Sequence, residues 1–115
     1  MPAGLYNITA EQGATFTRTL TWNTSTGTPV NLTGYTARMQ VRADYDAATV
    51  LLNLTTENGG ITLGGALGTI VLTATATATA AVSSGSYVYD LELILGSTVT
   101  RLVQGSFVVN AEVTR

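Results

Sequence analysis

The chain has 115 residues and a net charge of −2 at pH 7, with 45% apolar and 10% charged residues, which suits one folded domain over residues 1–115. A weakly acidic chain without lysine lacks the basic footprint of nucleic-acid binding and a cationic cluster for a membrane surface. Histidine and cysteine are absent as well, which excludes a Ser-His-Asp triad, a disulfide framework and a thiolate metal site. We expect no cofactor and no small-molecule substrate.

The N-terminal segment MPAGLYNITAEQG has no basic head followed by an apolar run, so we expect no signal peptide. No stretch of the chain reaches the roughly 18 apolar residues of a membrane helix. Both observations favour synthesis in the cytoplasm and no membrane partner.

Most of the chain alternates apolar and polar residues with the period of two that marks half-buried strands. In residues 14–22, ATFTRTLTW, apolar side chains share one face and threonines share the other. In residues 35–42, YTARMQVR, the apolar set alternates with threonine, arginine and glutamine. The other expected strands cover residues 5–9, 50–55, 69–75, 86–95, 99–104 and 107–113.

The connections between these runs are rich in glycine, threonine, serine and asparagine, as in NTSTGTP, ENGG and LGGALG, and they predict turns. No helical period of 3.6 residues persists, although TATATAAVSS has room for one helical turn. Short strands at this spacing predict an antiparallel sandwich or barrel. The side chains expected in its core are Phe16, Leu20, Trp22, Met39, Val41, Ile70, Leu72, Tyr87, Leu91, Leu93, Phe107 and Val109.

Gly96 and Ser97 predict a two-residue hairpin turn, because a type II′ turn favours glycine at its first central position. This turn sets a register in which Glu92 faces Arg101. Continued without interruption, it also pairs Asp90 with Val103. Leu102 and Phe107 both have core character, but an uninterrupted strand would direct them to opposite faces of the sheet. We therefore expect a bulge at Gly105 that redirects the strand.

Asp90 and Glu92 lie two residues apart and raise the question of a catalytic carboxylate pair. A catalytic pair needs a pocket and unlike surroundings for its two groups. The expected register instead gives Glu92 a cross-strand partner in Arg101, which favours a structural role.

With Leu91 and Leu93 turned toward the core, the outer face of the hairpin carries apolar residues around an ion pair. Such a face is typical of a subunit contact, whereas an exposed face of a monomer is more often polar throughout. The alternative is that valine and isoleucine serve strand propensity alone. The candidate subunit interface consists of Val88, Glu92, Ile94, Val99, Arg101 and Val103.

The spacing Gly85-Ser86-Tyr87-Val88-Tyr89 is typical of the tyrosine corner of immunoglobulin-like sandwiches. Tyr87 would be the corner tyrosine, and Tyr89 would stand where such domains often carry a core cysteine. Trp22 lies on an earlier strand than the tryptophan of that pattern. The sequence therefore predicts an all-β, antiparallel immunoglobulin-like β-sandwich of about seven or eight strands.

The order of GTPVNLTGYTARMQVR, GGITLGGALGTIVL, GSYVYDLEL and VTRLVQGSFVV resembles small structural proteins of tailed bacteriophages. It is also similar to the immunoglobulin-like N-terminal domain of phage baseplate upper proteins, although the chain ends at Arg115 without a following stalk or receptor-binding segment. The resemblance implies a non-enzymatic virion protein of the tail or baseplate that assembles with other virion proteins.

Two other functions remain open. A capsid decoration (cement) protein is the close alternative, because small β-domains also serve as decoration proteins. A carbohydrate-binding module is a more distant one, because such modules expose a row of aromatic residues. Most of the eight aromatic residues here fall on faces expected to be buried, and only Tyr6 and Tyr45 are easy candidates for exposure.

Overall fold

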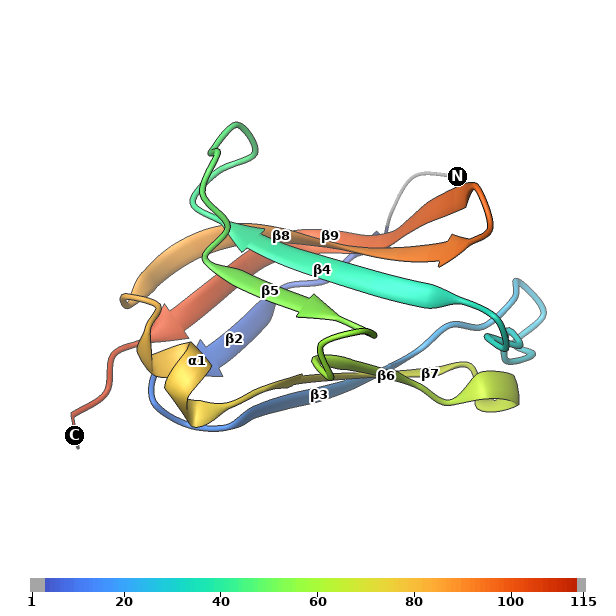
Figure 1. The fold of residues 1–115 in the computed structure, drawn as a ribbon, viewed down its shortest axis with the longest axis horizontal. Coiled ribbons are helices and arrows are strands. Elements are labelled where there is room, and N and C mark those ends of the chain that lie inside the picture. Colours follow the sequence, from blue (N-terminus) through green and yellow to red (C-terminus); the bar gives the residue numbers. More distant parts are fainter. Residues whose placement is uncertain (1–3, 114–115) are drawn as a thin grey trace.

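The computed structural model of this protein describes residues 4–113, which form nine strands in two sheets packed face to face (Figure 1). The larger sheet has the order β1-β9-β8-β4-β5, with β2 also pairing with β9. Its strands are β1 (Gly4–Leu5), β2 (Ile8–Glu11), β4 (Thr36–Arg42), β5 (Leu52–Thr55), β8 (Gly85–Leu95) and β9 (Thr98–Asn110). The smaller sheet has the order β3-β7-β6, formed by β3 (Phe16–Thr21), β7 (Thr69–Ala74) and β6 (Ile61–Leu63).

This strand order is that of an immunoglobulin-like sandwich, with β3, β7 and β6 in the places of strands B, E and D. Strands β9, β8, β4 and β5 take the places of G, F, C and C′. The predicted fold class is therefore confirmed. The pairing is antiparallel except that β1 and β2 run parallel to β9.

The strand boundaries differ from the expected ones in three places. The run expected at 5–9 divides into β1 and β2, and the two runs expected at 99–104 and 107–113 form one strand, β9. The structure adds β6, which lies in a glycine-rich segment whose composition predicts turns. Three residues between glycines are too few for an alternation to be recognised.

The core lies between the two sheets and is built by the alternation seen in the sequence. Phe107 of β9 packs edge-on against Phe16 of β3, with 5.8 Å between ring centroids, and so joins the sheets. Of the twelve predicted core side chains, nine are buried, while Leu20, Trp22 and Tyr87 are half-buried and pack against the core. The threonines of β3 are exposed on the opposite face, as predicted.

Two short helical segments lie in the connections. The helix α1 (Ala76–Ala80) occupies the segment expected to hold a helical turn, and the Thr75 side chain caps it by accepting a hydrogen bond from the Ala78 N–H at 3.1 Å. A 3₁₀ turn, η1 (Gly65–Leu67), precedes β7. Among residues 4–113 no helix has both the length and the apolar character needed to cross a membrane.

The β8–β9 hairpin confirms the predicted turn but corrects the register beyond it. Gly96 has a φ of 59°, and Glu92 faces Arg101 as expected. The register then shifts by one residue, so that Leu102 has no partner and Leu91 pairs with Val103. The bulge therefore lies at Leu102, and the prediction of a bulge at Gly105 was wrong.

Pairing continues through Gly105, which lies opposite Tyr89, and Phe107 is directed into the core. Glycine is needed at position 105 for a different reason. A Cβ there would lie 2.6 Å from the carbonyl oxygen of Tyr6 and 2.7 Å from Oδ1 of Asn7. The close approach of the segment between β1 and β2 therefore determines this position, and alternation along one strand cannot reveal it.

The predicted tyrosine corner is present at the start of β8. The Tyr87 hydroxyl donates a hydrogen bond to the backbone carbonyl of Ser83 in the preceding connection. Two residues later Tyr89 is buried, and its hydroxyl donates to the carbonyl of Tyr6. Burial raises the pKa of Tyr89, so this hydroxyl stays protonated and remains a donor.

Tyr87→Phe is expected to lower the free energy of unfolding by roughly 0.5–1.5 kcal/mol, because it removes one hydrogen bond and leaves the ring in place. Tyr45→Phe is the matched control, because Tyr45 is 70% exposed and its loss of a hydroxyl should change little. Chemical denaturation of the three proteins measures the difference. Equal stability of Tyr87→Phe and Tyr45→Phe would show that the corner hydrogen bond contributes nothing.

Gly105→Ala is expected to destabilise the domain by roughly 1–3 kcal/mol, because the added methyl group meets a backbone carbonyl that cannot move independently. Gly4→Ala is the control on the adjacent strand, where the nearest atom to a new Cβ is 3.6 Å away. Thermal or urea unfolding measures both variants. A neutral Gly105→Ala variant would contradict the close approach of Tyr6.

Candidate protein-contact face

The candidate functional site is the outer face of β4, β8 and β9, here called the outer face. Odd-numbered residues of β8, such as Leu91 and Leu93, are fully buried. Successive side chains of a strand point to opposite faces, so the even-numbered residues of β8 point outward. The strand registers arrange the outward side chains in rows that cross the three strands. From the hairpin end these rows are Thr36–Ile94–Val99, Arg38–Glu92–Arg101, Gln40–Asp90–Gln104 and Arg42–Val88–Ser106.

The second row places Glu92 between two arginines. Arg38 Nε lies 2.8 Å from Glu92 Oε1, and a guanidinium nitrogen of Arg101 lies 3.9 Å from Glu92 Oε2. Arg101 also reaches diagonally to Asp90, with 3.3 Å between Nε and Oδ2. Both carboxylates of the Asp90–Glu92 pair are thus engaged with arginine, which supports the structural interpretation over a catalytic one.

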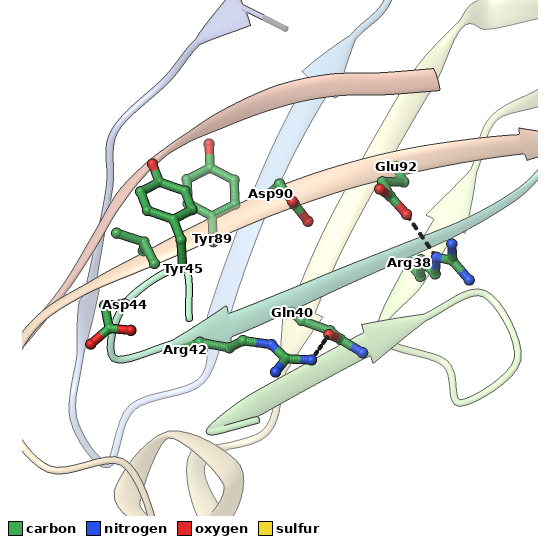
Figure 2. Close-up of a pocket in the computed structure, with 9 residues that line it drawn as sticks. Arg38, Gln40, Arg42, Asp44, Tyr45, Tyr89, Asp90 and Glu92 are labelled. Carbon is green, nitrogen blue, oxygen red and sulfur yellow. Dashed lines mark hydrogen bonds and ion pairs between the residues drawn. The ribbon is translucent and has the colours of Figure 1, made fainter. Parts of the chain in front are cut away.

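A shallow hollow of about 290 Å³ lies along β4 and β8, and its lining extends from the Arg38–Glu92 pair to Arg42 (Figure 2). One wall is Arg42, whose guanidinium donates to the Gln40 side chain at 2.8 Å and to the Ala47 carbonyl at 2.6 Å. Asp44 and Tyr45, from the loop after β4, also line it. The Asp44 carboxylate accepts the Asp46 N–H, so this acidic loop is held as a turn.

The electrostatics of the face centre on Asp90. Burial raises the pKa of Asp90 above its ordinary value of 3.8, and the neighbouring Glu92 charge raises it further. Arg101, Arg38 and Arg42 act in the opposite direction and favour the ionised carboxylate. The carboxylates and arginines of this face therefore form one ion-pair network.

Five of the six predicted interface residues lie together on the outer face: Val88, Glu92, Ile94, Val99 and Arg101. Val103 does not, because the bulge at Leu102 turns it to the side of Leu91, where it packs against the core. Placing Val103 on this face was therefore wrong. Gln104 takes the place opposite Asp90.

The contribution of β4 to this face was not predicted from the sequence. Arg38, Gln40 and Arg42 lie beside β8 and make the middle of the face charged rather than apolar. The alternation in YTARMQVR placed these side chains on one outward face, but it carried no information on which strand would pair with which. The apolar character remains at the hairpin end, where Ile94 is half-buried and Val99 is 49% exposed.

No protein-family model and no curated protein matches this chain. Among solved structures, it is similar to extracellular domains of the voltage-gated sodium channel β4 subunit, at 11% identity and a TM-score of 0.42. That alignment covers 98% of this chain and 97% of the other. A second similar structure, from work on cell-adhesive interactions of sodium channel β subunits, has 11% identity, a TM-score of 0.39 and coverages of 96% and 93%. Likeness at this level leaves the function of this chain open.

Asp90→Asn tests the electrostatics of the face. The pKa of Asp90 is higher in the folded than in the unfolded protein, so just above pH 3.8 this carboxyl binds more protons in the folded state than in the unfolded state. The contribution of Asp90 to the free energy of unfolding therefore falls as the pH rises through this range. The variant lacks this titration, so its stability relative to the wild type should increase between about pH 3 and pH 7. Urea unfolding of both proteins across this range measures the difference, and a difference that is constant or decreases would contradict the raised pKa.

Proposed function

We propose that this domain is a non-enzymatic structural component of a tailed-bacteriophage particle, in the tail or baseplate, and that its outer face contacts a neighbouring subunit. The proposed partners are other virion proteins, and the proposed location is the virion after synthesis in the host cytoplasm. The observation that carries the proposal is the composition of the outer face. At the hairpin end of this face the exposed Val99 and the half-buried Ile94 adjoin an ion-pair network, a combination that suits a specific protein contact.

The two parts of the face would contribute differently to such a contact. Burial of Val99 and Ile94 removes apolar area from water and supplies the driving force. The charged rows hold Arg38, Arg101 and Glu92 in fixed positions, and exposed charges of this kind select partner and orientation more than they add affinity. This division resembles the apolar core and polar rim of protein interfaces.

The absence of catalysis is part of the proposal. The chain contains no histidine, cysteine or lysine, and the Asp90–Glu92 carboxylate pair is engaged by arginines. Within the part of the chain that the structure describes, no three histidine, cysteine, aspartate or glutamate residues gather as a metal site would require. The features favour binding over chemistry.

The fold suits the phage resemblance, because the baseplate domain to which the sequence is similar is also immunoglobulin-like. A capsid decoration protein would use the same kind of face and is the second candidate. A carbohydrate-binding module has less support. Of the aromatic residues in 4–113 only Tyr45 is largely exposed, and the Tyr6 ring packs against the core while its hydroxyl accepts a hydrogen bond from Arg18 at 3.1 Å.

Ile94→Arg is expected to leave the isolated domain folded, because Ile94 points away from the core, and to reduce its incorporation into particles. Thr62→Arg, an exposed position on the smaller sheet, is the control for the added charge. Circular dichroism checks the fold, and quantitative blotting of purified particles measures incorporation.

Normal incorporation of a folded Ile94→Arg variant would overturn the contact face. Electron microscopy of intact particles that carry a tag on this protein tests the location independently. Density at the tail or baseplate is the expected result, density over the capsid would support a decoration protein, and absence from the particle would refute the virion assignment.

A further inference from the structure

The two sheets have four edges that no further strand covers among residues 4–113, one of them formed by β2 together with the two-residue β1, and three of the four edges are blocked. At the β2 edge, the Thr9 carbonyl accepts a hydrogen bond from the Arg18 guanidinium at 3.3 Å, and the Glu11 carbonyl accepts one from the Ala14 N–H at 3.2 Å. Backbone groups that already have partners cannot pair with another strand. The β2 edge is therefore protected.

The β5 and β6 edges are protected in other ways. Beside β5, the Asn58 side chain occupies both kinds of backbone group: its Oδ1 accepts the Thr55 N–H at 2.9 Å, and its Nδ2 donates to the Asn53 carbonyl at 2.9 Å. Strand β6 has only three residues, which offers an added strand too little to bind.

Strand β3 is different, because its six residues pair with β7 alone. The Trp22 N–H donates to the Gly68 carbonyl of the β7 side at 2.9 Å, and backbone direction alternates along a strand. Phe16, Arg18 and Leu20 therefore bond to β7, and the N–H and C=O groups of the threonines between them point away from the sheet. Within the described part of the chain these outward groups of Thr17 and Thr19 have no partner.

Of the usual protections, this open edge carries only one, an inward-pointing charge. It has no proline and no bulge, and its outward side chains are exposed threonines. The one charge on the strand, Arg18, is directed across the gap between the sheets, where it donates to the Tyr6 hydroxyl at 3.1 Å and to Thr9. In immunoglobulin sandwiches of the constant type, strand A occupies the position beside strand B. Here the first strands pair with β9 instead, so that this position stays open.

We propose that a second copy of this chain pairs with β3 through its own β3, antiparallel, about a two-fold axis at Thr19. This register uses all three outward threonines, since Thr19 faces itself and Thr17 faces Thr21 of the second copy. It forms threonine–threonine pairs on the exposed face, which are favourable across strands. On the other face it sets Arg18 against Leu20 of the second copy.

Neighbouring registers are less favourable. An axis at Arg18 sets two guanidinium groups directly opposite each other, and like charges in that position are destabilising. An axis at Leu20 leaves Thr17 beyond the paired region. The self-complementary register at Thr19 is therefore the reason for choosing a second copy as the occupant. This contact uses a different surface from the outer face, and it does not depend on the phage assignment.

Site-directed cross-linking tests the pairing, because the chain has no cysteine of its own. Thr19→Cys, treated with a short bis-maleimide, is expected to give a covalent dimer, since the two side chains are neighbours across the axis. Thr62→Cys is the control, because position 62 is also exposed on the same sheet but lies on β6, away from the axis. Equal cross-linking of the two variants, or none at Thr19→Cys, would overturn the proposal.

A backbone substitution separates strand pairing from chance collision. Thr17→Pro, added to Thr19→Cys, removes an outward N–H and should spare every bond to β7. By symmetry it deletes two intermolecular hydrogen bonds, so dimer formation should weaken by about ten- to a hundredfold. Circular dichroism checks that the variant folds, and Thr17→Lys takes its place if it does not. Undiminished cross-linking in a folded variant would show that the copies do not meet through β3.

Discussion

The β8–β9 hairpin is the constraint on which the rest of the structure depends. Gly96 starts a tight turn, and from there the two strands remain paired for almost their whole length. The shift at Leu102 decides which side chains of β9 face the core: it directs Val103 and Phe107 inward and Arg101 outward. Without it, Phe107 would point to solvent and the contact with Phe16 that joins the sheets would be lost. Core and outer face are therefore set by one local irregularity.

The outer face, the proposed contact surface, is polar over most of its area, but its carboxylates are paired. Glu92 and Asp90 have arginine partners within the fold, so their charges are oriented before any contact forms. A contact that covers them does not leave an unpaired charge, which is the costly event at interfaces. Val99 and Ile94 at the hairpin end supply apolar area that such a contact can bury. Orientation and driving force thus come from adjacent parts of one surface.

At two edges of the larger sheet, side chains of this chain bond to the backbone groups of the edge strand. The Arg18 side chain reaches from β3 and donates a hydrogen bond to a backbone carbonyl of β2. Beside β5, the Asn58 side chain bonds to one backbone N–H and one backbone C=O, as a neighbouring strand would. A side chain can do this only where it is held rigidly, and Asn58 is held by its own N–H bond to the Thr55 hydroxyl at 2.9 Å. The edge of β3 therefore differs from the other three edges, which are blocked.

The sequence by itself determined the strand character, the tyrosine corner at Tyr87, the turn at Gly96 and most of the core, because alternation and turn chemistry are local properties. Only the tertiary structure decided the bulge at Leu102 and the need for glycine at position 105, since both depend on what a distant segment brings alongside. The same holds for the pairing of β4 with β8, which brings Arg38 to Glu92. Strand partners are set by packing over the whole chain, and no local pattern encodes them.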